Sequence, residues 1–117
     1  MEGNNKLAKD DIKDKILLLN IKQSYPELGV DQAVKEAWKV DLKRVKEVKY
    51  ICAVYQNIII ETFERDEGTV WYDVQGTQGR RGFYGHPVDS FYKNKDVSNL
   101  VDWKKGRNPV RYLPKRK

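Results

Sequence analysis

The segment of this chain whose residue types suggest the clearest chemistry is GRRGFYG, residues 79–85. It places two neighbouring arginines between glycines and beside two aromatic residues. Arg80 and Arg81 can clamp a phosphate with paired N–H donors. Phe83 and Tyr84 point to opposite sides of an extended segment, so one ring is available to stack on a base. The segment favours nucleic-acid binding. The structural alternative is a curved strand in which glycines allow the bend and the arginines pair with nearby carboxylates.

Other basic and aromatic residues extend this prediction. The residues predicted to contact phosphates are Arg80, Arg81, Lys104, Lys105 and Arg111. The residues predicted to line a base pocket are Asn20, Ser24, Trp38, Trp71 and Tyr84. Large aromatic residues at helical spacing mostly pack in a core, so a core position is the favoured interpretation of Trp38 and a pocket wall is the alternative. Trp71 and Tyr72 are adjacent in a predicted strand, so one ring is buried and the other is exposed or at the rim.

The chain offers few groups for catalysis or metal binding. His86 is the only histidine and Cys52 the only cysteine, whereas a zinc site needs three or four such ligands. His86 with Asp89 is the acid–base pair that an enzyme would use, but a turn residue is the favoured interpretation of His86. Cys52 lies within an apolar strand and is expected to be a buried, reduced thiol. The sequence therefore predicts no catalytic residue, no metal and no cofactor.

Charge is distributed unevenly along the 117 residues. Residues 1–66 hold 12 Lys and Arg against 12 Asp and Glu, whereas residues 67–117 hold 11 against 5, which accounts for the whole net charge of +6. A cationic surface attracts polyanions because neutralising phosphates releases counterions. This asymmetry, together with the interleaved aromatic residues, favours RNA or DNA as the partner.

The elements that must position these residues follow from hydrophobic spacing and turn chemistry. The run Ile16–Lys22 predicts a buried strand that becomes half-exposed at its end. Two short helices follow, with Asp31 and Asp41 as their N-caps. A hairpin over Tyr50–Glu64 turns at Gln56-Asn57, because asparagine tolerates the positive φ that a primed turn requires. Several short strands with polar turns complete the chain, the last of them at 108–113.

This order of elements resembles the PUA-like superfamily, which includes PUA, ASCH, EVE and YTH domains. The segments that carry the resemblance are ILLLNIKQSY, AWKV, DLKRVKEV, YICAVYQNIII, WYDV, RRGFYGHPV and NPVRYL. The resemblance implies a small β-barrel that binds RNA, or a modified base flipped out of RNA or DNA. The GxKxxExR pattern of ASCH domains and a complete YTH aromatic cage are absent from the sequence.

The sequence as a whole predicts an α+β protein: a small PUA-like β-barrel with two short helices inserted after the first strand. Residues 1–14 are expected to form a flexible arm or short helix, 15–113 a single barrel domain, and 114–117 a basic tail. The predicted function is a nucleic-acid-binding module, and the reading of a single or modified base in RNA or DNA is the task that the resemblance implies. An RNA-cleaving ASCH-like hydrolase and a protein-interaction accessory domain are the alternatives. No apolar run approaches the roughly 20 residues of a membrane span, and a cytoplasmic location is expected.

Overall fold

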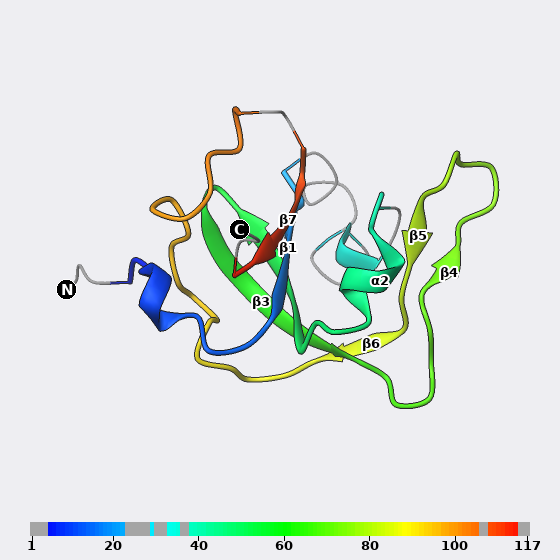
Figure 1. The fold of residues 1–117 in the computed structure, drawn as a ribbon, viewed down its shortest axis with the longest axis horizontal. Coiled ribbons are helices and arrows are strands. Elements are labelled where there is room, and N and C mark those ends of the chain that lie inside the picture. The colour runs from blue at the N-terminus through cyan, green and yellow to red at the C-terminus, as the bar shows by residue number, and fades with distance from the viewer. Residues whose placement is uncertain (1–4, 23–28, 30–32, 36–37, 106–107, 115–117) are drawn as a thin grey trace.

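The computed structural model describes residues 5–22, 29, 33–35, 38–105 and 108–114 (Figure 1). A 3-10 helix, η1, comes first, and an open five-stranded sheet, the short helix α2 and a separate two-stranded sheet follow. The elements are η1 (Lys9–Asp11), β1 (Ile16–Asn20), α2 (Leu42–Val45), β2 (Tyr50–Tyr55), β3 (Ile58–Arg65), β4 (Tyr72–Asp73), β5 (Arg81–Gly82), β6 (Gly85–Pro87) and β7 (Val110–Leu113).

The larger sheet has the strand order β6-β3-β2-β1-β7. β1 and β2 are parallel, and the segment that contains α2 connects them, as a parallel pair requires. The other neighbours are antiparallel. β7 pairs with β1, from the opposite half of the sequence, through the register Ile16↔Leu113 to Leu19↔Val110. The fold therefore depends on a contact between segments far apart in the chain.

The predicted β-barrel is wrong. The sheet ends at β6 on one side and at β7 on the other, and these two strands do not pair. Barrel closure needs strands long enough to tilt and stagger around an axis, whereas β6 has three residues and β7 has four. The separate β4–β5 sheet also takes up residues that the barrel prediction counted among its short strands.

β1 is buried on both faces, which explains why its sequence does not alternate between apolar and polar residues. Leu17 and Leu19 point to one face and pack in what we call the helix-side core, with Ile51 and Phe63 among its other members. Ile16 and Leu18 point to the other face, in the loop-side core, together with Cys52, Val54, Ile59, Tyr92, Val97 and Val101. A barrel would have a single interior, whereas this sheet lies between two covering layers.

Each core has its own cover. Residues 33–35 and 38–40, α2 and the β4–β5 sheet cover the helix-side core, to the right of the large sheet in Figure 1. The N-terminal segment and the long connection from β6 to β7 cover the loop-side core, on the left. Leu7, in the predicted arm, is 1% exposed, and its N–H donates to the Asp96 carbonyl at 2.8 Å. Residues 115–117 of the predicted tail lie outside the described residues.

The β2–β3 hairpin turns where its sequence predicts. Gln56 has φ 52° and Asn57 has φ 69°, and Tyr55 pairs with Ile58 across this two-residue turn. Positive φ at both central residues defines a type I′ turn, whose twist matches that of the two strands. The register shifts between Ala53 and Val54, so β3 contains a bulge opposite them.

The predicted helices are found only in part. α2 ends at Val45, short of the predicted Val48, and Trp38, predicted to close the first helix, instead forms a β-bridge with Arg81. Asp41 caps α2, because its Oδ1 accepts a hydrogen bond from the Lys43 N–H at 2.9 Å. Residues 33–35 are helical, in agreement with the first predicted helix, whereas its predicted N-cap Asp31 lies outside the described residues. Val45 of α2 is buried in the helix-side core and Val48 packs against it, whereas Leu42 is exposed.

Candidate nucleic-acid interface

The β4–β5 sheet carries the GRRGFYG segment and is held to the body of the protein by backbone hydrogen bonds. Tyr72 pairs with Gly82, and Asp73 pairs with Arg81. Arg81 also exchanges two hydrogen bonds with the backbone of Trp38, at 2.8 and 2.9 Å. The arginine segment is therefore fixed on both sides, by β4 and by residue 38.

The inner face of this small sheet is part of the helix-side core. Trp71 and Phe83 are buried there, with ring centroids 5.0 Å apart, and Phe83 makes an edge contact with Phe63 at 6.3 Å. The prediction that adjacent rings point to opposite sides is confirmed at both pairs. Trp71 is buried and Tyr72 is half-buried, whereas Phe83 is buried and Tyr84 is exposed.

The two outward rings come together on the opposite face. The ring centroids of Tyr72 and Tyr84 are 4.9 Å apart, with 36° between the ring planes, and Tyr84 is 55% exposed. Gly82 makes room for this arrangement, because a Cβ at position 82 would lie 2.7 Å from the Tyr72 ring. We call this surface, made by Tyr72, Gly82 and Tyr84, the tyrosine face.

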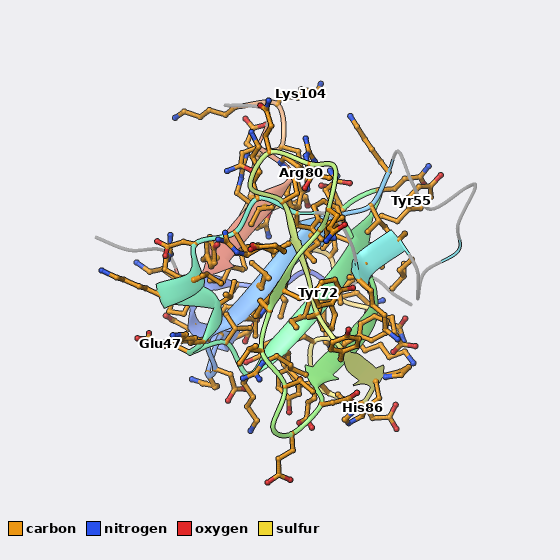
Figure 2. All side chains as sticks on the ribbon, turned by 90° about the vertical axis from the view of Figure 1, so that its right-hand side faces the viewer. Glu47, Tyr55, Tyr72, Arg80, His86 and Lys104 are labelled. Carbon is orange, nitrogen blue, oxygen red and sulfur yellow. The ribbon has the colours of Figure 1, made fainter. Side chains whose placement is uncertain are left out.

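The two arginines lie at one end of the tyrosine face. Arg80 is exposed, and in Figure 2 its side chain lies above Tyr72. The Arg81 Nε is 3.3 Å from Oδ1 of its cross-strand partner Asp73. This ion pair is the contact that the structural alternative predicted for the arginines. Asp73 is almost fully exposed and the Arg81 side chain is 26% exposed, so solvent screens their attraction.

His86, the single histidine, lies at the other end, below Tyr72 in Figure 2, and has acidic residues beside it. His86 Nδ1 is 2.7 Å from Oδ1 of Asp66, and His86 Nε2 is 3.9 Å from Oε1 of Glu64. The predicted partner was Asp89, three residues along the chain. The structure instead brings Asp66 to His86, because β3 and β6 pair with Glu64 opposite His86.

The predicted base-pocket residues do not share one hollow. Trp38 and Trp71 are 7% and 8% exposed, and both pack in the helix-side core. The Trp38 Nε1–H donates to the Val34 carbonyl at 2.9 Å, so its polar atom is also used internally. The Asn20 Oδ1 accepts from the Lys22 N–H, and Ser24 lies outside the described residues. Of the predicted pocket rings, Tyr84 is the exposed one.

The predicted phosphate contacts form two groups. Arg81 belongs to β5 and Arg80 directly precedes it, whereas Lys104, Lys105 and Arg111 lie on the β7 side. In Figure 1, α2 lies between β5 and β7. The Arg111 guanidinium donates to the carbonyls of Asp102 and Lys105 at 3.2 and 2.9 Å. Arg111 therefore ties the 102–105 loop to β7, while Lys104 and Lys105 are exposed.

A cavity of about 270 Å³ lies between α2 and β7. The Arg44 guanidinium carbon is 3.9 Å from the centroid of the Tyr112 ring at this cavity. The Tyr112 hydroxyl accepts a hydrogen bond from the Asp41 N–H at 2.8 Å. Lys15, which also lines the cavity, forms an ion pair with Glu47. The charged groups at this cavity thus have partners within the protein, and the contacts fasten α2 to β7.

Metal binding and thiol chemistry find little support in the geometry. No group of three or more His, Cys, Asp or Glu side chains is arranged to hold a metal ion in the part of the chain that the structure describes. Cys52 is fully buried, and burial raises the pKa of its thiol far above the ordinary value. A thiol in this environment does not serve as a nucleophile at neutral pH.

Sequence reasoning missed the contact between Tyr72 and Tyr84 and the contact between His86 and Asp66. The sequence did hold a signal for the contact between Tyr72 and Tyr84. Each of two short segments has one buried ring next to one outward ring, and pairing of the segments brings the two outward rings to the same face. The signal for the second was missing, because it depends on the register between β3 and β6.

Comparison with protein-family models, with curated proteins and with solved structures finds no match to this chain. The resemblance to PUA-like domains therefore stays a prediction. Among the residues described, no helix has both the length and the apolar character needed to cross a membrane.

Proposed function

We propose that this protein binds nucleic acid through the tyrosine face and the adjoining arginines Arg80 and Arg81. The observation that carries the proposal is the packing of Tyr72 against Tyr84 on the solvent side of the strand pair that bears both arginines. Aromatic rings supply stacking surfaces for bases, and arginines supply charge-assisted hydrogen bonds to phosphates. The net charge of +6, which resides in residues 67–117, favours a polyanionic ligand.

Binding to a labelled RNA or DNA oligonucleotide of mixed sequence, measured over a salt series, tests this proposal. We expect affinity to fall as salt increases, because each neutralised phosphate releases counterions. Arg80→Gln should weaken binding and reduce the slope of log affinity against log salt by about 0.7 to 0.9 for the one lost phosphate contact.

Lys9→Gln is the matched control. It also removes one positive charge, but from η1, on the opposite side of the molecule from β4 and β5 in Figure 1. The control should retain the affinity and the slope of the unmodified protein. If no oligonucleotide binds at low salt, or if both variants lose affinity equally, the proposal is wrong.

RNA cleavage is the second candidate function, and the contact between His86 and Asp66 favours it. A carboxylate that accepts the Nδ1–H of a histidine holds the ring with Nε2 free to take a proton, as general-base catalysis requires. The test is incubation of labelled RNA with the protein and with His86→Ala. Equal product from both, or none from either, removes this candidate.

A further inference from the structure

The tyrosine face is assembled before any ligand arrives. Tyr72 lies against the backbone at Gly82 and also packs on Tyr84, so it supports the exposed ring from the side. A ring held in this way loses little rotamer freedom when a second flat group stacks on it. The arrangement therefore favours a planar ligand that presents an open ring face.

The backbone around this face is equally well fixed. Gly82 follows Arg81, whose backbone is bonded to Trp38, and the Phe83 N–H donates to the Lys35 carbonyl at 3.1 Å. The carbonyl of Tyr84 accepts from the Asp66 N–H at 2.8 Å. The side chain of Tyr84 is therefore exposed while its backbone is held in place by a hydrogen bond, as a ring that stacks on a ligand requires.

The two ends of the tyrosine face carry charges of opposite sign. At one end of the β4–β5 sheet, Arg80 and Arg81 outnumber the single carboxylate of Asp73, which pairs with Arg81. At the other end, Glu64 and Asp66 lie beside His86. In Figure 2 Tyr72 is between Arg80 and His86. Carboxylates repel phosphates, so a nucleic-acid backbone is favoured at the arginine end and disfavoured beyond the rings.

We infer that the tyrosine face takes an unpaired nucleobase, and that the ligand is therefore single-stranded nucleic acid, a conclusion that rests on the proposed function. In a duplex, each base face is covered by its neighbours, and only groove edges and phosphates are accessible to a side chain. In a single strand the base can leave its neighbours and stack on a tyrosine. The backbone then passes the arginine end, where its charge is matched.

The test compares two labelled oligonucleotides with the same strand sequence at one fixed salt concentration. One is single-stranded, and the other is a duplex whose ends are closed by short hairpin loops of non-nucleotide linker, so that no base face is exposed. We expect the single strand to bind at least about fivefold more tightly, the gain that stacking of one base supplies.

Tyr84→Ala and Tyr84→Phe separate ring stacking from simple charge attraction. Tyr84→Ala should weaken single-strand binding by about 5-fold to 100-fold and leave duplex binding unchanged. Tyr84→Phe keeps the ring and should bind within about twofold of the unmodified protein. Tyr84→Phe keeps the contact with the Tyr72 ring and should unfold at the same urea concentration as the parent. Tyr84→Ala loses this contact and the stability it contributes, so urea unfolding is used to confirm that the variant is folded under the binding conditions.

The outcomes distinguish this inference from the proposed function. If the closed duplex binds as tightly as the single strand, or if a folded Tyr84→Ala variant keeps its single-strand affinity, the inference is overturned while nucleic-acid binding stands. If neither oligonucleotide binds at low salt, the proposed function fails, and the inference fails with it.

Discussion

The ring of Tyr72 lies directly against Gly82, its cross-strand partner between β4 and β5. A Cβ added at position 82 would be 2.7 Å from the Tyr72 ring on one side and 2.6 Å from the Lys35 carbonyl oxygen on the other. An aromatic ring that covers a glycine on the paired strand shields the exposed backbone there. This contact joins the tyrosine face to the helical segment behind it.

Gly82→Ala should therefore destabilise the protein by about 1–3 kcal/mol, the usual cost of overpacking a filled site. The Lys35 carbonyl belongs to the backbone and cannot move aside as a flexible side chain would. Urea unfolding measures the change. Gly79→Ala is the control. Position 79 has φ +76° but open space for a Cβ, so this substitution costs only backbone strain, about 1–2 kcal/mol. A Gly82→Ala variant as stable as the parent contradicts the packing described.

The β2–β3 turn offers a stabilising change. Gln56 has φ 52°, a conformation that costs a residue with an ordinary side chain about 1–2 kcal/mol. Asn-Gly is the preferred pair for a type I′ turn. Gln56→Asn combined with Asn57→Gly should raise the free energy of unfolding by about 0.5–1 kcal/mol, measured by urea titration. A loss of stability would show that the turn is not of this type.

Tyr92 should make stability depend on alkaline pH. Its hydroxyl donates to Asp14 Oδ2 at 2.9 Å and accepts from the backbone N–H groups of Lys13 and Asp14. Burial, reinforced by the Asp14 carboxylate, raises the pKa of Tyr92 above its ordinary value of 10.0. The stabilisation is therefore complete below about pH 10 and is lost as the pH rises through the higher pKa of the folded state.

Urea unfolding at pH 8 and at pH 10.5 tests this contribution. Tyr92→Phe should lower stability at pH 8 by about 1–3 kcal/mol, because two backbone donors lose their partner. The same variant should lose less stability than the parent between the two pH values. Equal losses in both proteins would show that Tyr92 does not contribute to the alkaline response.

Cys52 should be inert in the folded protein. It is 0% exposed, and burial raises the pKa of its thiol, so both access and thiolate formation are suppressed. We expect iodoacetamide to modify it at pH 8 only at the rate of unfolding, and within minutes in concentrated urea. Rapid modification without denaturant, measured by intact mass, would contradict the burial of β2.

The two cationic groups should contribute unequally to binding. The proposal places the ligand beside Arg80, whereas Lys104 and Lys105 are on the β7 side, beyond α2 (Figure 1). At about 0.15 M salt, where charges act over about 8 Å, Arg80→Gln should weaken oligonucleotide binding more than Lys104→Gln and Lys105→Gln together. Anisotropy titrations measure both. A larger effect of the lysine pair would move the interface to β7.

Local features of this fold could be predicted from the sequence, because they depend on neighbouring residues. Asp41 as a cap, the turn at Gln56-Asn57 and the opposite directions of Trp71 and Tyr72 all follow from short-range stereochemistry. The buried run at Ile16–Leu19 was also recognisable, since a strand covered on both faces is apolar throughout.

Features that depend on strand order could not be predicted in this way. The pairing of β7 with β1, which leaves the sheet open, is a long-range choice with no local signature. The same applies to His86 and Asp66, which strand register brings together. The sequence favours a core position for Trp38, which is buried, but its backbone pairing with Arg81 is a contact between residues far apart in the sequence and has no local signal.

The position of β1 has a consequence for synthesis in the cell. β1 leaves the ribosome early, but its partner β7 is translated only after nearly all the other described elements. Until then the nascent chain carries an unpaired strand edge formed by apolar residues, a known route to association between chains. Chaperone capture of the newly made protein should therefore persist until residues 110–113 are free of the ribosome and pair with β1, and should then end.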